Sequence, residues 1–293
     1  MTDVVRPVLP SLLSKQVGKQ ASTSGPFRTQ LVMSVERPRQ VKVVPFPFDR
    51  RLVVAAGRAG RRMVPMHGLL QIDVTVANRL LASHDPPLSF TAFVVASAAR
   101  AASEHPEVHA YRNWRGQLVT HGHVDVTTLV EILTPRGLFG LPHVIRDADI
   151  RGVEDLTTEL RRVKQDPSTS GSGRLLERVA PIGTRIPGVL RAMYAVMARS
   201  TAARQRTGTV SVTAVGMFAA GGGFGVAPMT LMSLQVVVGG MSPRPRALDG
   251  DIVVRDVVDL TVSIDHNVVD GAPATRFGAA LRELMETADV LRS

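Results

Sequence analysis

A histidine near the C-terminus occupies the most chemically suggestive setting in the sequence. His266 follows the strand-like run VVDLTVSI (257–264), and Asp270 and Gly271 come directly before a helical pattern. Imidazole changes its protonation nearest neutral pH, so a histidine at a strand end beside a glycine turn is a candidate for acid–base chemistry. Core and capping histidines outnumber catalytic ones, but the sequence offers no competing cluster of nucleophile and base. The chain has no cysteine, which excludes disulfides, thiolate metal sites and a cysteine nucleophile.

Three weaker signals each have a non-functional explanation, which we favour. His121 and His123 would share one side of a strand, but two histidines without a third ligand rarely bind a metal, and we expect no metal site. The glycine-rich GGGFG (221–225) lacks the Lys-Ser/Thr ending of a phosphate-binding loop. The basic cluster GRAGRR (57–62) could contact phosphates or nucleic acid, although a solvated face is the commoner explanation.

The segments around these residues alternate between helical and strand patterns, which predicts a mixed α/β sandwich rather than a bundle or an all-β fold. Ser89 is the expected cap of an alanine-rich buried helix, and Asp73 or Thr75 of another. In the first half of the chain, we expect a strand and helix over 68–81, a helix over 89–105, meander strands over 117–137 with breaks at Gly122 and 135–137, and a helix over 150–165. In the second half, we expect two short helices joined by a kink over 175–200, strands at 208–218, 231–240 and 257–264, and a last helix with Pro273 in its first turn.

Basic charge is concentrated at the N-terminus. The chain has a formal net charge of +10, and residues 1–62 hold 12 of its 35 Lys and Arg but only 3 of its 25 acidic residues. Residues 1–41 are rich in Ser, Gly, Pro, Lys and Arg without a sustained period, so we expect a flexible basic arm followed by one domain over 42–293. Aromatic residues make up 4% of the chain, and no motif supports nucleic-acid binding, which we do not expect.

No apolar run approaches the ~18–20 residues that a membrane-spanning helix needs. Residues 1–15, interrupted by Pro7 and Pro10, do not resemble a signal peptide. We therefore expect a cytoplasmic protein without a membrane partner.

Six sequence blocks occur in an order that resembles a known family. They are GLLQIDVT, TPRGL, PHVIRDADIRGVEDL, GTVSVTAVGMF, VVVGG and SIDHNVVDGAPATRF, and they span roughly residues 60–293. This ordered set resembles the catalytic domain of the dihydrolipoyl acyltransferase component of 2-oxoacid dehydrogenase complexes, which is similar in turn to chloramphenicol acetyltransferase. The resemblance implies a coenzyme A-dependent acyltransferase folded as a two-layer mixed-sheet sandwich of the chloramphenicol acetyltransferase-like type.

The resemblance also implies a homotrimer, or a multiple of one, with active sites between neighbouring subunits. His266 matches the general base that takes a proton from a thiol, and the reference imidazole pKa of ~6.5 suits that role. Thr213 stands where the family has a serine hydroxyl that donates to the oxyanion, with Ser211 as the alternative if the register differs by two. Asp270 would hold the histidine loop by hydrogen bonds or an arginine pair. The expected coenzyme contacts are Gly216, Gly225 and Ser211.

Departures from the family pattern leave the substrate open. Asn267 replaces the arginine that usually follows the histidine, residues 166–207 have no convincing match, and none of the four lysines has the context of a lipoyl attachment site. We therefore expect coenzyme A or acyl-coenzyme A as a substrate, no lipoyl group in this chain, and an acyl thioester delivered on coenzyme A or by a separate carrier or dehydrogenase partner. The acceptor is a thiol, or a hydroxyl or amine. The alternative hypothesis is an inactive trimeric scaffold or regulatory binding module.

Overall fold

The computed structural model describes residues 41–44, 46–134, 137–171, 174, 188–214 and 221–292. The contacts divide the chain into residues 1–44 and residues 45–293. The fold below is that of the second unit. The expected basic arm over 1–41 lies, except for its last residue, outside the described residues, as does the expected first helix of the kinked pair over 175–187.

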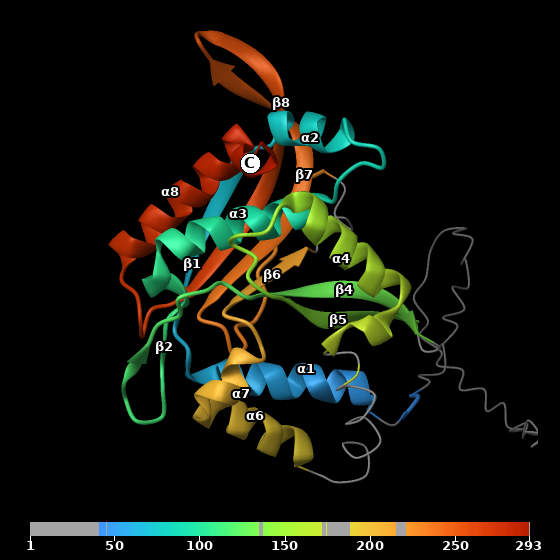
Figure 1. The fold of residues 1–293 in the computed structure, drawn as a ribbon, viewed down its shortest axis with the longest axis vertical. Helices are drawn as coiled ribbons and strands as arrows, with labels where there is room; N and C mark the ends of the chain where they lie inside the picture. Colours follow the sequence, from blue (N-terminus) through green and yellow to red (C-terminus); the bar gives the residue numbers. More distant parts are fainter. Residues whose placement is uncertain are drawn as a thin grey trace, which may run out of the picture. The chain divides into compact units, whose positions relative to one another are not determined.

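A six-stranded mixed sheet forms the centre of this unit (Figure 1). Its strands are β1 (Pro65–Asp73), β4 (Val126–Thr134), β5 (Gly137–Ile145), β6 (Val210–Ala214), β7 (Leu234–Leu248) and β8 (Asp251–Asp265). Their order across the sheet is β1-β8-β7-β6-β4-β5. β6 runs parallel to both of its neighbours, whereas the other adjacent pairs are antiparallel. A separate two-stranded ribbon consists of β2 (Tyr111–Arg112) and β3 (Leu118–Val119).

The helices fall into two groups (Figure 1). One group, α2 (Thr75–Ala82), α3 (Phe90–Glu104), α4 (Val153–Gln165) and α8 (Gly271–Thr287), packs on one face of the sheet. The other group contains α1 (Phe48–Ala59), α6 (Val189–Arg199) and α7 (Thr201–Gln205), in which α6 contacts both α1 and α7. The short 3-10 helices are η1 (Gly60–Arg62), η2 (Pro106–His109), η3 (Pro167–Thr169) and η5 (Asp289–Leu291). The expected mixed α/β class is confirmed.

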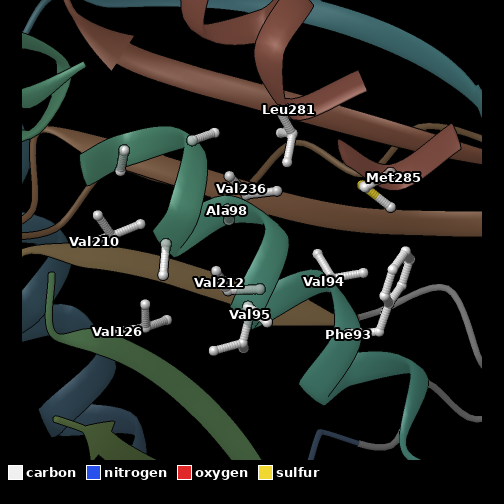
Figure 2. Packing of buried hydrophobic residues seen from close by; sticks show 14 of the residues in the cluster. Phe93, Val94, Val95, Ala98, Val126, Val210, Val212, Val236, Leu281 and Met285 are labelled. Atoms are coloured by element: carbon white, nitrogen blue, oxygen red, sulfur yellow. The ribbon is translucent and has the colours of Figure 1, made fainter. Parts of the chain in front are cut away.

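The core lies between the sheet and α3, and it follows from alternation along the strands. Every second residue of a strand points to the same face, so one set of apolar strand residues meets the helices. The opposite set of β6, Ser211 and Thr213, therefore points away from α3. Small side chains on α3 allow the helix to approach the strands closely, and α3 is capped as expected, because the Ser89 Oγ accepts from the Ala92 amide at 3.3 Å. Figure 2 shows this contact, which includes Phe93, Val94, Val95, Ala98, Val126, Val210, Val212, Val236, Leu281 and Met285.

The hairpin of β7 and β8 is longer than the sequence patterns predicted. The expected strands at 231–240 and 257–264 extend to a tight turn at Asp249 and Gly250, which have φ angles of 50° and 92°. Asp-Gly is a favoured pair for such a two-residue turn, so the signal was present in the sequence. Pro243 and Pro245 are tolerated because β7 pairs with β6 only over residues 234–238 and has β8 alone as a neighbour beyond them.

None of the described helices is long and apolar enough to cross a membrane. Helix α1 was not expected from the sequence, because none of its described residues is buried and it contributes none of the core side chains.

Candidate active site

The histidine loop, residues 265–270, connects the end of β8 to the start of α8. Strand β8 ends at Asp265, whose amide donates to the Ser233 carbonyl at 2.9 Å. The next amide, of His266, donates to the Val64 carbonyl at 2.8 Å, just before β1. The chain is therefore anchored to two different neighbours immediately before the imidazole leaves the sheet.

A backbone carbonyl fixes the orientation of the imidazole. The Nδ1 atom of His266 lies 2.9 Å from the Val269 carbonyl oxygen. A carbonyl can only accept a hydrogen bond, so Nδ1 carries the proton and Nε2 keeps its lone pair in the neutral ring. The side chain is 49% exposed, and Nε2 has no hydrogen-bond partner among the described residues. This arrangement presents a proton acceptor to the outside of the chain.

Asp265 holds the histidine loop in place. Its side chain is buried, and its Oδ1 accepts from the Val64 amide at 3.0 Å, the Asn267 amide at 3.1 Å and the Asn267 Nδ2 at 2.8 Å. Asn267 Nδ2 also donates to the Arg62 carbonyl at 3.0 Å. The residue that replaces the usual arginine thus ties the loop to η1.

Among the described residues of this chain, the Asp270 side chain has no hydrogen-bond partner that would hold the loop as expected. Its carboxylate is 91% exposed, and its Oδ1 lies 3.8 Å from the Nδ1 of His266. Its backbone carbonyl accepts from Ala274 at 3.3 Å in the first turn of α8. The hydrogen bonds that hold the loop within this chain come instead from Asp265, the last residue of a buried strand, whereas Asp270 lies at an exposed helix end.

The Thr213 hydroxyl lies on the sheet face opposite α3 and far from the imidazole of the same chain. Thr213 pairs with Val237 on β7, which pairs with Thr261 on β8. His266 is five residues beyond Thr261, or about 16 Å along the strand, and two strand spacings add about 10 Å across the sheet. One chain therefore does not bring Thr213 and His266 together. Ser211 is two residues nearer the histidine end, because it pairs with Gln235, which pairs with Ser263, but two strand spacings still separate it from β8.

The other expected coenzyme contacts lie in or near the glycine-rich segment. Gly216 falls outside the described residues, and Gly225 is half-buried. The Gly223 amide donates to Asp259 Oδ2 at 2.7 Å, and its carbonyl accepts from Gly240 at 2.8 Å. A Cβ on Gly239 would lie 2.2 Å from the Gly223 carbonyl oxygen. In one chain, GGGFG therefore packs against β7 where the pairing register with β8 shifts, between Val238 and Met241, and it contacts the buried carboxylate of Asp259.

The histidines outside the loop form a ring cluster. The His121 ring centroid lies 5.8 Å from that of His109 and 5.7 Å from that of Tyr111. Burial, and next the neighbouring histidines, lowers the pKa of His109 to about 4, and burial also lowers the pKa of His121. Across the described ranges, no group of three His, Cys, Asp or Glu could hold a metal ion.

Solved structures with the same fold are acyltransferase cores. One is from a crystallographic and enzymatic study of a serine, a histidine and an asparagine in the mechanism of Azotobacter vinelandii dihydrolipoamide acetyltransferase, with a TM-score of 0.65 and 18% identity. Another is the cubic core of the pyruvate dehydrogenase multienzyme complex, with a TM-score of 0.63 and 19% identity. Each comparison covers 87% of this chain and 95% of the other.

The curated relatives are acyltransferase components of larger complexes. The chain is 23% identical over 225 residues to a dihydrolipoyllysine-residue succinyltransferase component from Haemophilus influenzae, covering 76% of this chain and 46% of the relative. It is 24% identical over 266 residues to a lipoamide acyltransferase component from Bacillus subtilis, covering 85% and 53%. The chain thus spans about half the length of these relatives. The family of 2-oxoacid dehydrogenase acyltransferases (catalytic domain) matches residues 59–170 and 194–292, and this chain belongs to it.

Proposed function

We propose that this chain catalyses acyl transfer between coenzyme A and a second acceptor, with His266 as the general base. The observation that carries the proposal is the hydrogen bond from Nδ1 to the Val269 carbonyl, which leaves the Nε2 lone pair to accept a proton. Family membership supports the same reaction class. The catalytic domain in this proposal is residues 42–293.

The reaction needs one proton acceptor and one oxyanion donor. Nε2 of His266 takes the proton from the attacking thiol, and the thiolate sulfur attacks the carbonyl carbon of the acyl thioester. The oxygen of the resulting tetrahedral intermediate carries the negative charge, which a threonine hydroxyl can stabilise by donating a hydrogen bond. When the intermediate collapses, the original carbon–sulfur bond breaks, and the imidazolium returns its proton to the departing thiolate. A hydroxyl or amine acceptor would be deprotonated in the same way.

Two chains supply these groups in our proposal. The separation of about 19 Å between Thr213 and His266 in one chain, estimated from strand geometry, means that they can act together only across a subunit contact. We propose a homotrimer or a multiple of one, in which His266 of one subunit faces Thr213 of the next. Ser211 is the alternative donor, and Gly216, Gly225 and Ser211 remain the proposed coenzyme contacts.

Asp270 has an electrostatic role in this proposal. Its carboxylate lies 3.8 Å from Nδ1 of His266 and would favour the imidazolium that forms during the reaction. In the Azotobacter vinelandii protein, the histidine and the asparagine that were studied lie four positions apart, which is also the separation of His266 and Asp270. The acyl donor is a small acyl thioester, carried by coenzyme A or presented by a separate carrier or dehydrogenase partner.

Thiol release from a panel of acyl-coenzyme A donors tests the proposal. His266→Ala should lower turnover by ~10²–10⁴-fold, as expected for loss of a general base, and calorimetry should find an unchanged affinity for coenzyme A, because a neutral imidazole does not anchor phosphates. Arg282→Gln, an exposed change on α8, is the control. A wild-type protein that binds no coenzyme A and turns over none of the panel would favour the scaffold hypothesis instead.

A further inference from the structure

A large groove with an unusual concentration of arginines opens beside the histidine loop. It has a volume of about 1650 Å³, and Asp265 and Asn267 are among the residues that line it. We call it the arginine groove, because eight of its lining residues are arginines and Asp265 is the one acidic residue among them. Helices α1 and α6 and the β2–β3 ribbon contribute to its walls. Arg51, Arg58, Arg61 and Arg62 come from α1 and η1, and Arg191 and Arg199 come from α6.

Among the described residues, none of the arginines that line this groove forms an ion pair. The arginine ion pairs of the described residues involve Arg146, Arg151, Arg244 and Arg255, none of which lines the groove. A concave surface lined by one sign of charge focuses its field and attracts ions of the opposite sign. The groove is therefore suited to an anion with several charges.

Two buried hydroxyls in the groove also have no partner. Ser233 is 1% exposed and Tyr111 is 3% exposed, both line the groove, and neither hydroxyl oxygen has a hydrogen-bond partner in the part of the chain that the structure describes. Buried hydroxyls normally have a partner, so this pair indicates a missing acceptor. The Arg204 guanidinium stacks on the Tyr111 ring at 3.7 Å and donates to the Leu231 carbonyl, which places a cation beside the ring.

Part of the arginine groove comes from segments that the family match does not cover. The family match covers residues 59–170 and 194–292, so Arg51, Arg58 and Arg191 lie outside it. GRAGRR, for which a solvated face was the favoured explanation, supplies Arg58, Arg61 and Arg62 to the groove. The groove next to the histidine loop therefore combines arginines from inside and outside the matched ranges.

We propose that the arginine groove binds the phosphorylated nucleotide end of the acyl-thioester substrate. This inference rests on the proposed acyl transfer, because it assigns the site that binds the nucleotide part of the thioester substrate. Several arginines can form charge-assisted hydrogen bonds with phosphate oxygens. Trp114, which is 63% exposed and lines the groove, offers an aromatic ring on which a base can stack. The thiol arm then runs from this anchor toward the histidine loop.

Calorimetric titration of the full chain with coenzyme A, dephospho-coenzyme A, adenosine 3′,5′-bisphosphate and pantetheine tests the proposal. The test variant is Arg58→Gln with Arg191→Gln, which removes one exposed charge from each wall, and the matched control is Arg282→Gln. The wild type should bind coenzyme A at least about tenfold more tightly than pantetheine, and the double variant should lose about tenfold or more of that affinity. The loss should shrink at high salt. Tyr111→Phe, which removes only a hydroxyl, should weaken coenzyme A binding several-fold.

Equal coenzyme A affinity in the wild type, the double variant and the control would overturn the proposal. Equal affinity of the wild type for coenzyme A and pantetheine would do the same. If the wild type instead binds single-stranded DNA but no nucleotide, and the double variant loses the DNA binding, the proposal is overturned and the groove is a nucleic-acid site. If adenosine 3′,5′-bisphosphate binding depends on the two arginines but no acyl donor is turned over, the groove assignment stands and the acyl transfer fails. If the double variant turns over acyl-coenzyme A and binds coenzyme A with the affinity of the wild type, the proposed acyl transfer stands and the groove assignment is wrong.

Discussion

The chemistry of His266 depends on contacts made by its immediate neighbours. Its residue type, its place after a strand and the Asp-Gly pair make it a candidate from the sequence. The Val269 carbonyl that fixes its tautomer could not be predicted, because every residue has a carbonyl and only the path of the loop aims one at Nδ1. The sequence likewise offers aspartates on both sides of the histidine, and burial in the folded chain distinguishes them.

Replacing these two aspartates should have unequal effects on stability. Asp265→Ala leaves the Val64 amide and the Asn267 side chain without a buried acceptor, so we expect it to lower the free energy of unfolding by about 2–3 kcal/mol. Asp270→Ala removes an exposed carboxylate and should change it by less than about 0.5 kcal/mol. Urea unfolding followed by circular dichroism measures both. A larger loss for Asp270→Ala than for Asp265→Ala would contradict this assignment of the loop anchor.

Elements that bury a clear apolar stripe were predictable, and elements that serve a surface were not. Helix α3 and its Ser89 cap follow from apolar spacing and a capping residue, because this helix packs on the sheet. Helix α1 contacts α6 rather than the main core, and none of its described residues is buried. The outer half of the β7–β8 hairpin escaped prediction for a related reason. Its Ile252 and Val254 are exposed, so no burial pattern marks it, although its Asp-Gly turn does.

The ring cluster between η2 and the β2–β3 region should make the fold sensitive to acid. The pKa of His109 is about 4 in the folded chain and near ~6.5 when unfolded. Between these values the unfolded state binds more protons, so stability is fully present above about pH 6.5 and falls as the pH drops toward about 4. His109→Phe keeps a ring in the stack and should flatten this part of the profile. Denaturant midpoints measured from pH 7.5 to pH 5 provide the check, and an unchanged slope in the variant would count against it.

At the scale of the whole molecule, our proposal gives the isolated chain two half-sites rather than one active site. The sheet register separates Thr213 from His266 by about five residues along β8 and by two strand spacings, and that separation follows from the pairing of β6, β7 and β8. The family resemblance led us to expect a shared site from the sequence, but neither composition nor spacing could have revealed it, because strand order is not written in any local pattern.

An assembly is therefore required for activity in this account. Multi-angle light scattering at micromolar concentration should give the mass of three chains of 31.5 kDa or a multiple of three. In a single chain, His266 and Thr213 would lie too far apart to act together. A stable monomer with full acyltransferase activity would refute the two-chain arrangement.

Complementation between two inactive variants tests the central claim most directly. His266→Ala and Thr213→Ala should each be nearly inactive alone, the second because loss of an oxyanion donor costs ~10²–10³-fold in turnover. In a mixed cyclic trimer, one of the three contacts pairs an intact His266 with an intact Thr213. Equal mixing with subunit exchange should therefore restore about one quarter of the wild-type activity. Activity that stays at the sum of the two parents after verified exchange would contradict a site shared between chains.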